Sequence, residues 1–265
     1  MVDFESKEFY DMQDYRRIIA LLRGEGGCPW DREQTHQSIR RNLLEEAYEV
    51  CEAIDEQDSE HLREELGDLM MQVLFHAQIE EEKGSFDLDG VADGACKKLI
   101  LRHPHVFGDV QVENSAEVLE NWDAIKRVEK HQATTGDAMD SVARSLPALW
   151  RAEKIQKKAA KAGFDWKNIS GASEKISEEL HELQCAIRDG DGIEEELGDV
   201  LFSVVNTARF AGVDPEAALH RSCEKFIRRY RAMEEEAASR GEELSALPLE
   251  QQDEIYQLVK LKNNL

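Results

Sequence analysis

"LREELGDLMMQ", residues 62–72, and "IEEELGDVLFS", residues 193–203, decide the fold of this chain. Apolar residues in both stretches recur at spacings of three and four, which predicts amphipathic helices. Each predicted helix carries a glycine, Gly67 or Gly198, between carboxylates, although glycine inside a helix costs about 1 kcal/mol relative to alanine. A destabilising glycine between carboxylates occurs in both predicted helices, and this repetition indicates a duplicated element with a function.

The helical spacing extends through almost the whole sequence, and no sustained strand-like alternation occurs. It predicts helices at 11–23, 36–57, 60–83, 88–102 and 115–131, and then at 145–162, 172–189, 193–211, 215–239 and 250–263. Residues 131–142, "HQATTGDAMDSV", contain few large apolar side chains and are typical of a linker. We therefore predict an all-α fold with an N-terminal domain at 1–130, a linker at 131–144 and a C-terminal domain at 145–265.

Several predicted helix ends carry residues that start or stop helices. Asn114 with Glu117 fits a capping box, and Asp214 before Pro215 fits an N-cap followed by proline in the first turn. Glycine, which ends helices in a left-handed conformation, stands at the ends of four predicted helices: Gly84, Gly163, Gly212 and Gly241.

The two halves of the chain resemble each other in three blocks that occur in the same order. "LLEEAYEVCEAI" from Leu43 parallels "ISEELHELQCAI" from Ile176, and "EELGDLMMQVLFHAQ" from Glu64 parallels "EELGDVLFSVVNTAR" from Glu195. "CKKLILRH" and "CEKFIRRY" form the third pair. We interpret this as an internal duplication in which each half is a small helical bundle.

The composition excludes some classes of function. Of the 265 residues, 41% are apolar, which is enough to form a core, and 56 acidic against 33 basic residues give a net charge of −23. Because nucleic-acid binding needs basic side chains to replace counterions, we expect no direct binding to nucleic acid. A phosphorylated small molecule remains possible, since divalent cations can bridge carboxylate and phosphate.

Features related to location favour the cytoplasm. The five cysteines are scattered without a CxxC pair, which indicates free thiols in a reducing compartment. The first residues, "MVDFESKEFYD", lack the apolar segment of a signal peptide, and no apolar run approaches the roughly 18 residues that span a bilayer. We therefore expect no association with a membrane.

Carboxylates repeat on successive helices in each half. Residues three or four apart share a helix face, so two antiparallel helices would bring four carboxylates together. These are Glu46, Glu49, Glu65 and Asp68 in the first half, and Glu179, Glu182, Glu196 and Asp199 in the second. Like charges at such spacings destabilise a helix by roughly 0.2–0.5 kcal/mol per pair. A divalent cation would remove this repulsion, and an all-oxygen set favours Mg²⁺, with Mn²⁺ possible, over Zn²⁺.

Other interpretations explain only part of the pattern. A solvated acidic stripe accounts for the charge but not for the glycine, and a close crossing of helices accounts for the glycine but not for the carboxylates. A small residue beside a metal site would let backbone or ligand approach. Glu178 and His181 match the Glu-x-x-His pair of di-iron bundles, but such bundles need two pairs, and the first half has Tyr48 at the matching position.

A basic helix face follows the second carboxylate block. Lys225, Arg228 and Arg229 lie at i, i+3 and i+4, where they could hold a polyphosphate through bidentate arginine contacts. The alternative is a set of surface ion pairs worth about 0–1 kcal/mol each. The corresponding first-half face has Leu101 in place of one arginine. The sequence contains no GxxxxGK[ST] motif, which excludes a P-loop NTPase.

From about Tyr15 onward the chain resembles the MazG family of nucleoside triphosphate pyrophosphohydrolases, in its full-length two-domain bacterial form. The resemblance rests on the two carboxylate blocks and on further motifs: "GCPWDREQT", "LEEAYEV", "EELGDL", "RHPHVF", "SLPAL", "KIQKKAAKAGFDW" and "KFIRRYR". It implies two MazG-like helical domains, a homodimer, and Mg²⁺-dependent hydrolysis of ribo- and deoxynucleoside triphosphates to monophosphate and pyrophosphate. The implied roles are cleaning of the nucleotide pool or control of nucleotide signalling.

The resemblance also assigns site residues. The metal motif falls on Glu179, Glu182, Glu196 and Asp199, and the nucleotide contacts fall on Lys175, Glu178, and the segment from Lys225 through Arg228 to Arg229. Tyr256 stands where the family form has a tryptophan, and it could still stack on a base. The first-half metal positions match equally well, but Leu101 departs from the expected basic residue. Activity is therefore expected in the second half.

The expected reaction uses Glu178, Glu179 and Glu196 as catalytic residues. Glu178 or Glu179 would orient or deprotonate the attacking water, and spacing does not decide which carboxylate is the base. Two other classes of function remain open. One is a helical adaptor that binds protein partners through its acidic faces, and the other is a sensor that binds nucleotides without hydrolysing them.

Overall fold

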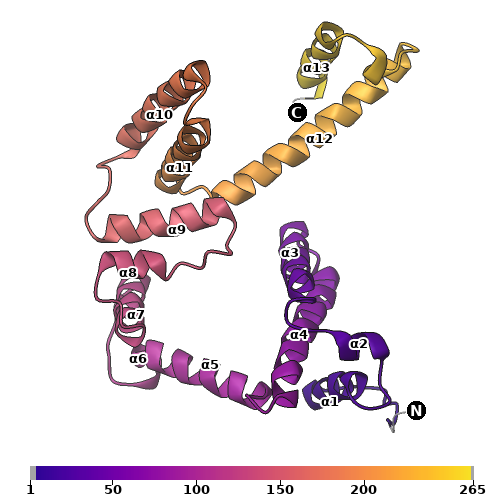
Figure 1. Cartoon of the computed structure of the whole chain (residues 1–265), viewed down its shortest axis with the longest axis vertical. Coiled ribbons are helices and arrows are strands. Elements are labelled where there is room, and N and C mark those ends of the chain that lie inside the picture. Colours follow the sequence, from indigo (N-terminus) through magenta and orange to yellow (C-terminus); the bar gives the residue numbers. More distant parts are fainter. Residues whose placement is uncertain (1–3, 264–265) are drawn as a thin grey trace. The chain divides into compact units, whose positions relative to one another are not determined.

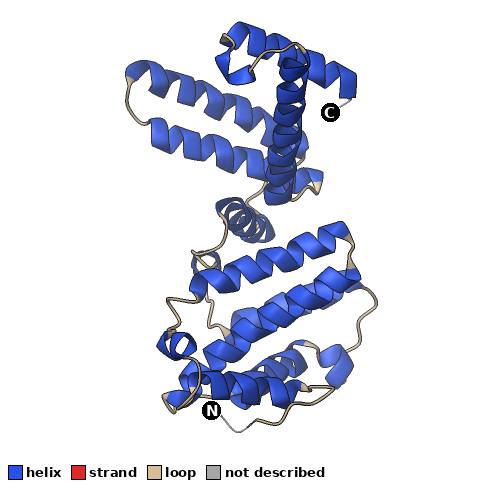
Figure 2. Cartoon of the chain, turned by 90° about the vertical axis from the view of Figure 1, so that its right-hand side faces the viewer, coloured by secondary structure: helices blue, strands red, loops and turns tan. Residues whose placement is uncertain are grey.

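The computed structural model describes residues 4–263, and in this range every regular element is a helix (Figures 1 and 2). The first seven helices are α1 (Met12–Arg23), α2 (Pro29–Glu33), α3 (Arg40–Glu56), α4 (Ser59–Glu82), α5 (Leu88–Arg102), α6 (Pro104–Phe107) and α7 (Ser115–Glu129). They are followed by α8 (Thr135–Asp140), α9 (Ala148–Lys161), α10 (Ile169–Asp189), α11 (Ile193–Ala211), α12 (Pro215–Ser239), the short 3₁₀ helix η1 (Leu244–Ala246) and α13 (Leu249–Asn263). The predicted all-α fold is confirmed.

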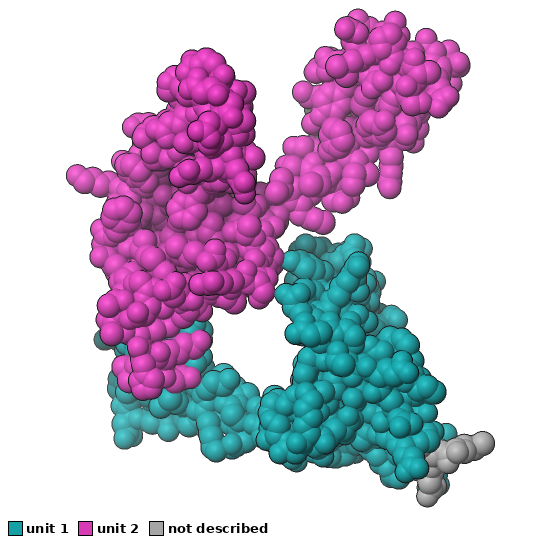
Figure 3. Space-filling view, in the orientation of Figure 1, with its two compact units in different colours: residues 1–126 teal, residues 127–265 magenta. Residues whose placement is uncertain are grey.

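The chain divides into two compact units, residues 1–126 and 127–265, which Figure 3 distinguishes by colour. We refer to them as unit 1 and unit 2. The division falls within α7. The segment 131–144, for which we predicted a linker, contains α8, and Ala138 and Val142 are buried there. Because α8 packs on α9, this segment contributes to unit 2.

The long helices lie where the apolar spacing placed them, and local contacts explain the shifted ends. α3 begins at Arg40 rather than at 36 because Thr35 and Ser38 each bond the other's backbone N–H through a hydroxyl, which favours a turn. α10 begins at Ile169 rather than at 172 because the Asn168 side chain accepts from the N–H groups of Ser170 and Gly171. The spacing missed α2, α6, α8 and η1, which are too short to show a helical period.

The predicted end signals are present except for the capping box at Asn114 and Glu117. The Asp214 side chain accepts from the Ala217 N–H, with Pro215 as the first residue of α12. The four glycines predicted to end helices all have positive φ: 70° at Gly84, 89° at Gly163, 67° at Gly212 and 75° at Gly241. At the start of α7, Asn114 accepts from the N–H groups of Ala116 and Glu117. Glu117 however accepts from the Glu113 N–H rather than completing a box with Asn114.

Each unit is built around an antiparallel helical hairpin, α3–α4 in unit 1 and α10–α11 in unit 2 (Figure 1). In unit 1 the core joins α1 and the start of α3 to the C-terminal half of α4, through Ile19, Ile39, Leu74, Phe75 and Ile79. In unit 2 a core cluster joins the end of α12 to η1 and α13, through Met233, Ala237, Leu244, Ile255 and Val259. These cores leave the polar faces of both hairpins free for other roles. Within residues 4–263, no helix has the combined length and apolarity needed to cross a membrane.

Candidate metal and nucleotide site

The α10–α11 hairpin of unit 2 is set by a short glycine-containing turn. Gly190 and Gly192 have φ of 74° and 72°, a left-handed backbone that glycine adopts without strain. The Gly190 N–H bonds the Ala186 carbonyl and ends α10, while Gly192 stands at the N-cap of α11. This turn reverses the chain so that the "EExxE" face of α10 lies opposite the "ExxD" face of α11.

Three carboxylates of unit 2 converge between the two helices. Glu179, Glu196 and Asp199 each place one oxygen within 4.8 Å of the others. Glu179 is buried, with 6% of its surface exposed, whereas Asp199 is exposed. Such a set, made of hard oxygen atoms on two rigid elements, has the donor chemistry of a Mg²⁺ or Mn²⁺ site. Glu182, the fourth expected ligand, is not part of this group.

Glu196 is the carboxylate of this group whose pKa is raised. Burial raises the pKa of Glu196, and the negative charges of Glu182, Asp199 and Glu179 raise it further. Glu182 is therefore close enough to act on Glu196 through its charge. The Glu196 Oε2 atom is also buried without a hydrogen-bond partner. A buried carboxylate oxygen that faces other carboxylates and has no donor is well suited to a cation.

A lysine side chain, Lys175, already places a positive charge beside two of the glutamates of α10. Lys175 Nζ lies 2.7 Å from Glu178 Oε1 and 2.6 Å from Glu179 Oε1. These two bonds raise the pKa of Lys175, so it stays a cation. Because it lies one turn before both glutamates on α10, it could reach phosphate oxygens that approach the cluster. His181 lies apart from the cluster, exposed on α10 with its Nε2 3.9 Å from Cys185 Sγ.

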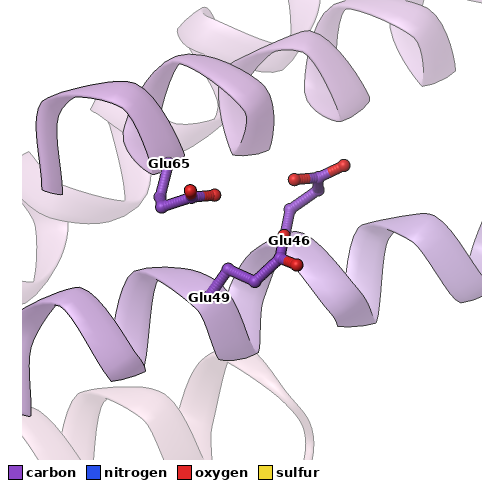
Figure 4. Close-up of side chains that lie close together, drawn as sticks. All are labelled: Glu46, Glu49 and Glu65. Atoms are coloured by element: carbon purple, nitrogen blue, oxygen red, sulfur yellow. The ribbon is translucent and has the colours of Figure 1, made fainter. Parts of the chain in front are cut away.

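Unit 1 has a similar cluster on its own hairpin. Glu46 and Glu49 project from α3, and Glu65 projects from α4, into the space between the helices (Figure 4). One oxygen from each lies within 4.8 Å of the others. Asp68, the fourth expected ligand, is not in the group, although its charge helps to raise the pKa of Glu46 after the larger effect of burial. The structure thus brings together three of the four expected residues in each half.

The neighbours of the two clusters differ. In unit 1, His61 Nε2 lies 3.2 Å from Glu65 Oε1, and Gln72 Nε2 lies 3.4 Å from Glu46 Oε1. The duplication aligns His61 with Gly192 and Gln72 with Ser203 in the second half. Sequence reasoning missed His61, although its i, i+4 spacing from Glu65 was visible. The two clusters are therefore related in ligands but not in surroundings.

The glycines beside the clusters are not needed for packing within either unit. A Cβ atom added at Gly67 or Gly198 would meet no atom within 4 Å. A close helix crossing within the unit is therefore wrong as an explanation for either glycine. The Gly67 carbonyl accepts from the Tyr15 hydroxyl at 3.1 Å, a bond that any residue could provide. What the glycines leave is open space next to the carboxylates.

The expected nucleotide-binding residues of α12 and α13 form a second polar group in unit 2. The Arg229 Nη1 donates to the Tyr256 hydroxyl at 3.2 Å, and its guanidinium lies 5.7 Å from the ring centre. Lys225 and Arg228 are exposed on α12. α13 packs on the C-terminal part of α12, while α12 leaves the hairpin near its own N-terminus (Figure 1). Within one chain this group and the carboxylates lie on separate arms of unit 2.

Comparison with known families gives two matches within the chain. The family described as "MazG nucleotide pyrophosphohydrolase domain" matches residues 34–107 and 169–233. Each match contains one carboxylate hairpin, and the second also contains the basic residues of α12. Tyr256 lies outside both matched ranges.

Three curated proteins show similarity along nearly the whole chain. The "Nucleoside triphosphate pyrophosphohydrolase" of Escherichia coli (strain K12) is 47% identical over 257 residues, which cover 94% of this chain and 98% of that protein. The "Nucleoside triphosphate pyrophosphohydrolase/pyrophosphatase MazG" of Thermotoga maritima is 45% identical, over 92% of this chain and 93% of that protein. The "Uncharacterized protein YabN" of Bacillus subtilis (strain 168) is 46% identical over 95% of this chain but only 52% of its own length.

Proposed function

The chain belongs to the MazG family and is a nucleoside triphosphate pyrophosphohydrolase, and from this premise we propose that a Mg²⁺-dependent reaction takes place at the carboxylate cluster of unit 2. The substrates are ribo- and deoxynucleoside triphosphates, cleaved between the α and β phosphates to give monophosphate and pyrophosphate. The roles are nucleotide-pool cleaning or control of nucleotide signalling. The enzyme acts in the cytoplasm, a location that the five free cysteines support.

The metal assignment rests on the partnerless Glu196 Oε2 atom. Glu196 lies in a group with Glu179 and Asp199, and a divalent cation would neutralise all three carboxylates at once. Glu179, Glu196 and Asp199 would hold the ion, and Glu182 would join through a change of rotamer or through water. Mn²⁺ would suit the same oxygen donors. Glu46, Glu49, Glu65 and Asp68 offer unit 1 a comparable site.

Two contrasts favour unit 2 as the active unit. Lys175 contacts Glu178 and Glu179 there, whereas the duplication places Asn42 at the corresponding position in unit 1. The basic face of α12 has Arg228 where α5 has Leu101. Both changes remove a cation that would hold phosphate, so unit 1 retains a metal-type cluster with a weaker phosphate site.

The side chains of unit 2 divide the reaction between them. When bound, Mg²⁺ supplies Lewis acidity and neutralises the charge on the phosphates. Glu178 is exposed, lies outside the carboxylate group and binds Lys175 through one oxygen, and we assign it to accept the proton of the attacking water. Lys175 and the cations of α12, Lys225, Arg228 and Arg229, hold the pyrophosphate as it leaves. Tyr256 offers a flat face for the base.

A homodimer would complete this site. Apolar side chains are exposed on the hairpin, including Leu197, Leu201 and Phe202, and also on α12, including Phe226 and Tyr230. Exposed apolar faces of this kind mark association surfaces. Since the α12–α13 arm lies apart from the hairpin of its own chain, the partner's arm is the one that would cover the carboxylates. Two chains related by a two-fold axis would then form two equal sites.

The test is a product assay with paired variants. We would incubate each nucleoside triphosphate with Mg²⁺ and separate monophosphate, diphosphate, pyrophosphate and orthophosphate, using wild type, Glu196→Gln and the matched Glu65→Gln. Monophosphate and pyrophosphate that disappear only in Glu196→Gln would support the proposal. Loss only in Glu65→Gln would move the reaction to unit 1.

The same assay separates the other functions. Saturable Mg²⁺-dependent nucleotide binding without any product would support a sensor, and the absence of both would support an adaptor. Orthophosphate that appears after pyrophosphate would reveal a second hydrolytic step, of the kind that the name of the Thermotoga maritima relative describes.

A further inference from the structure

A polar cluster in unit 1, separate from the carboxylates, joins residues 34–39 to α4. His36 Nδ1 lies 2.7 Å from His76 Nδ1, and His36 Nε2 lies 2.6 Å from Glu80 Oε1. Glu80 also accepts from Lys83 Nζ at 2.6 Å. These contacts form a continuous chain from a carboxylate through two imidazoles.

The two imidazoles meet edge to edge. Their ring planes differ by only 11° and their centres are 5.0 Å apart, while the Nδ1 atoms are much closer together. The nitrogens therefore lie between the ring centres and point at each other. Metal ligands instead direct their lone pairs to a common point at an angle. A shared proton, with one Nδ1 as donor and the other as acceptor, fits this geometry.

The number of protons decides whether the bond exists. Hydrogen bonds from Lys83 and His36 lower the pKa of Glu80 to about 2, so Glu80 is a carboxylate and His36 Nε2 carries a proton. In the neutral pair His36 accepts at Nδ1 and His76 donates. One added proton keeps the bond, because a His36 cation can donate from both nitrogens. A second added proton places N–H groups on both Nδ1 atoms and leaves no acceptor.

The surroundings make that second protonation costly for the closed arrangement. Burial lowers the pKa of His76, with a smaller effect from His36, and His76 Nε2 is buried without a partner. The charged groups near the two imidazoles already form ion pairs with one another. Arg23 on α1 binds Glu82 with two hydrogen bonds of 2.8 Å, and Lys83 binds Glu80. A cavity of about 380 Å³, lined in part by His36 and Lys83, gives solvent access to His36.

We propose that His36 and His76 form a proton-operated latch that holds residues 34–39 against α4 and opens when both imidazoles are protonated. α3 begins at Arg40, directly after the latched segment, and carries Glu46 and Glu49. Opening therefore loosens the helix that supplies two of the three carboxylates in the unit 1 cluster. The latch regulates the unit 1 site by pH.

The latch is specific to unit 1. The duplication places Thr207 and Ala211 in unit 2 at the positions of His76 and Glu80. Neither residue titrates, so unit 2 cannot make the same response. It serves as an internal control in the same molecule.

The experiment is hydrogen exchange with mass spectrometry on the full chain at about pH 7.5 and about pH 5, conditions on either side of histidine titration. After correction for the intrinsic effect of pH, we expect a several-fold gain in exchange for amides 34–44 at the lower pH. The segment 163–172, which includes the start of α10, should show no such gain. A gain of equal size in both segments would overturn the latch, since it would mean general loosening by acid.

Variants separate the imidazoles from other acid-sensitive groups. His76→Gln and His36→Gln each remove one imidazole of the pair and should abolish the gain at 34–44, while His220→Gln, at an exposed position, should keep it. If His76→Gln does not fold, His36→Gln carries the test, because His36 is about one-third exposed. A gain that persists in His36→Gln would refute the proposal. None of these readouts depends on nucleotide hydrolysis.

Discussion

Two residues in the unit 2 carboxylate hairpin, Glu196 and Gly198, reduce the stability of the helix that carries them. Glu196 is a half-buried carboxylate placed among carboxylates, and Gly198 is a helical glycine with nothing packed against the position of a Cβ atom. Neither choice favours the isolated fold, since both lower helix stability. Residues that reduce stability in the same place, two positions apart, indicate a site that is completed by something outside the chain's own packing.

The first prediction concerns Glu196. Its raised pKa means that the folded protein binds a proton more tightly than the unfolded chain, so without metal the free energy of unfolding rises as pH falls toward the pKa. We expect Glu196→Gln to melt at a higher temperature than wild type at neutral pH without metal. The difference should shrink below the ordinary carboxyl value of 4.5.

Melting curves with Mg²⁺ or with a chelator complete this test. Mg²⁺ should raise the melting temperature of wild type, and Glu196→Gln should respond much less, because it lacks one charged ligand. An equal response of both proteins to Mg²⁺ would exclude Glu196 as a ligand.

The second prediction concerns Gly198. Because an added Cβ meets nothing within 4 Å, Gly198→Ala should raise the free energy of unfolding by about 1 kcal/mol. It should also lower turnover, since the methyl group would enter space that substrate or partner needs. Gly67→Ala is the matched control, with the same gain in stability and unchanged turnover. Full activity of Gly198→Ala would show that the space has no catalytic use.

At the scale of elements, the hairpin turn decides which faces meet. The α10–α11 hairpin has a turn of three residues with two left-handed glycines, whereas the C-cap of α3 is Gln57, a non-glycine residue with φ of 58°. Both turns reverse the chain so that the carboxylates of one helix face those of the next. The unit 2 turn does so without backbone strain, and the unit 1 turn places a side chain in a region that costs about 1 kcal/mol.

The third prediction tests this turn. In Gly190→Ala the added Cβ atom would meet no atom within 4 Å, but the alanine would have to adopt a left-handed conformation at φ of 74°. It should therefore lower the free energy of unfolding by about 1 kcal/mol, as measured by urea denaturation. Gln57→Gly in unit 1 is the converse variant and should raise it. The two variants should therefore change the free energy of unfolding in opposite directions. A change in the same direction for both would contradict the role of backbone conformation.

At the scale of the whole molecule, duplication followed by divergence explains why two similar clusters have different surroundings. Unit 1 has acquired the His36–His76 pair and His61, while unit 2 has Lys175 and the arginines of α12. A metal-type cluster is present in both units, but unit 2 has two cations, Lys175 and Arg228, at positions where unit 1 has Asn42 and Leu101. This division is what we expect when one copy catalyses and the other regulates or assembles.

The fourth prediction follows from the separate arms of unit 2. If the α12–α13 arm of one chain completes the site of its partner, mixing inactive Glu196→Gln with inactive Arg228→Ala should restore activity. Each mixed dimer would hold one intact site, so an equal mixture should recover about a quarter of wild-type turnover. Steady-state kinetics after co-refolding measure this. No recovery, with mixed dimers demonstrated by mass spectrometry, would place both residues in a site within one chain.

Local sequence determined the helices and the duplication. Spacings of three and four placed the long helices, and the glycines and Asp214 marked their ends, because helix formation and capping depend on residues a few positions apart. The same local rule predicted that carboxylates from two successive helices would face each other. It also revealed the second copy, since repeated blocks need no structure to be seen.

Only the tertiary structure decided which members of each predicted set come together. It groups Glu179, Glu196 and Asp199 without Glu182, separates the α12–α13 arm from the hairpin, and joins His36 to His76 across 40 positions. Such contacts depend on loop lengths, on rotamers and on how helices pack. A helical period fixes the face on which a side chain lies, but not the partner that it meets there.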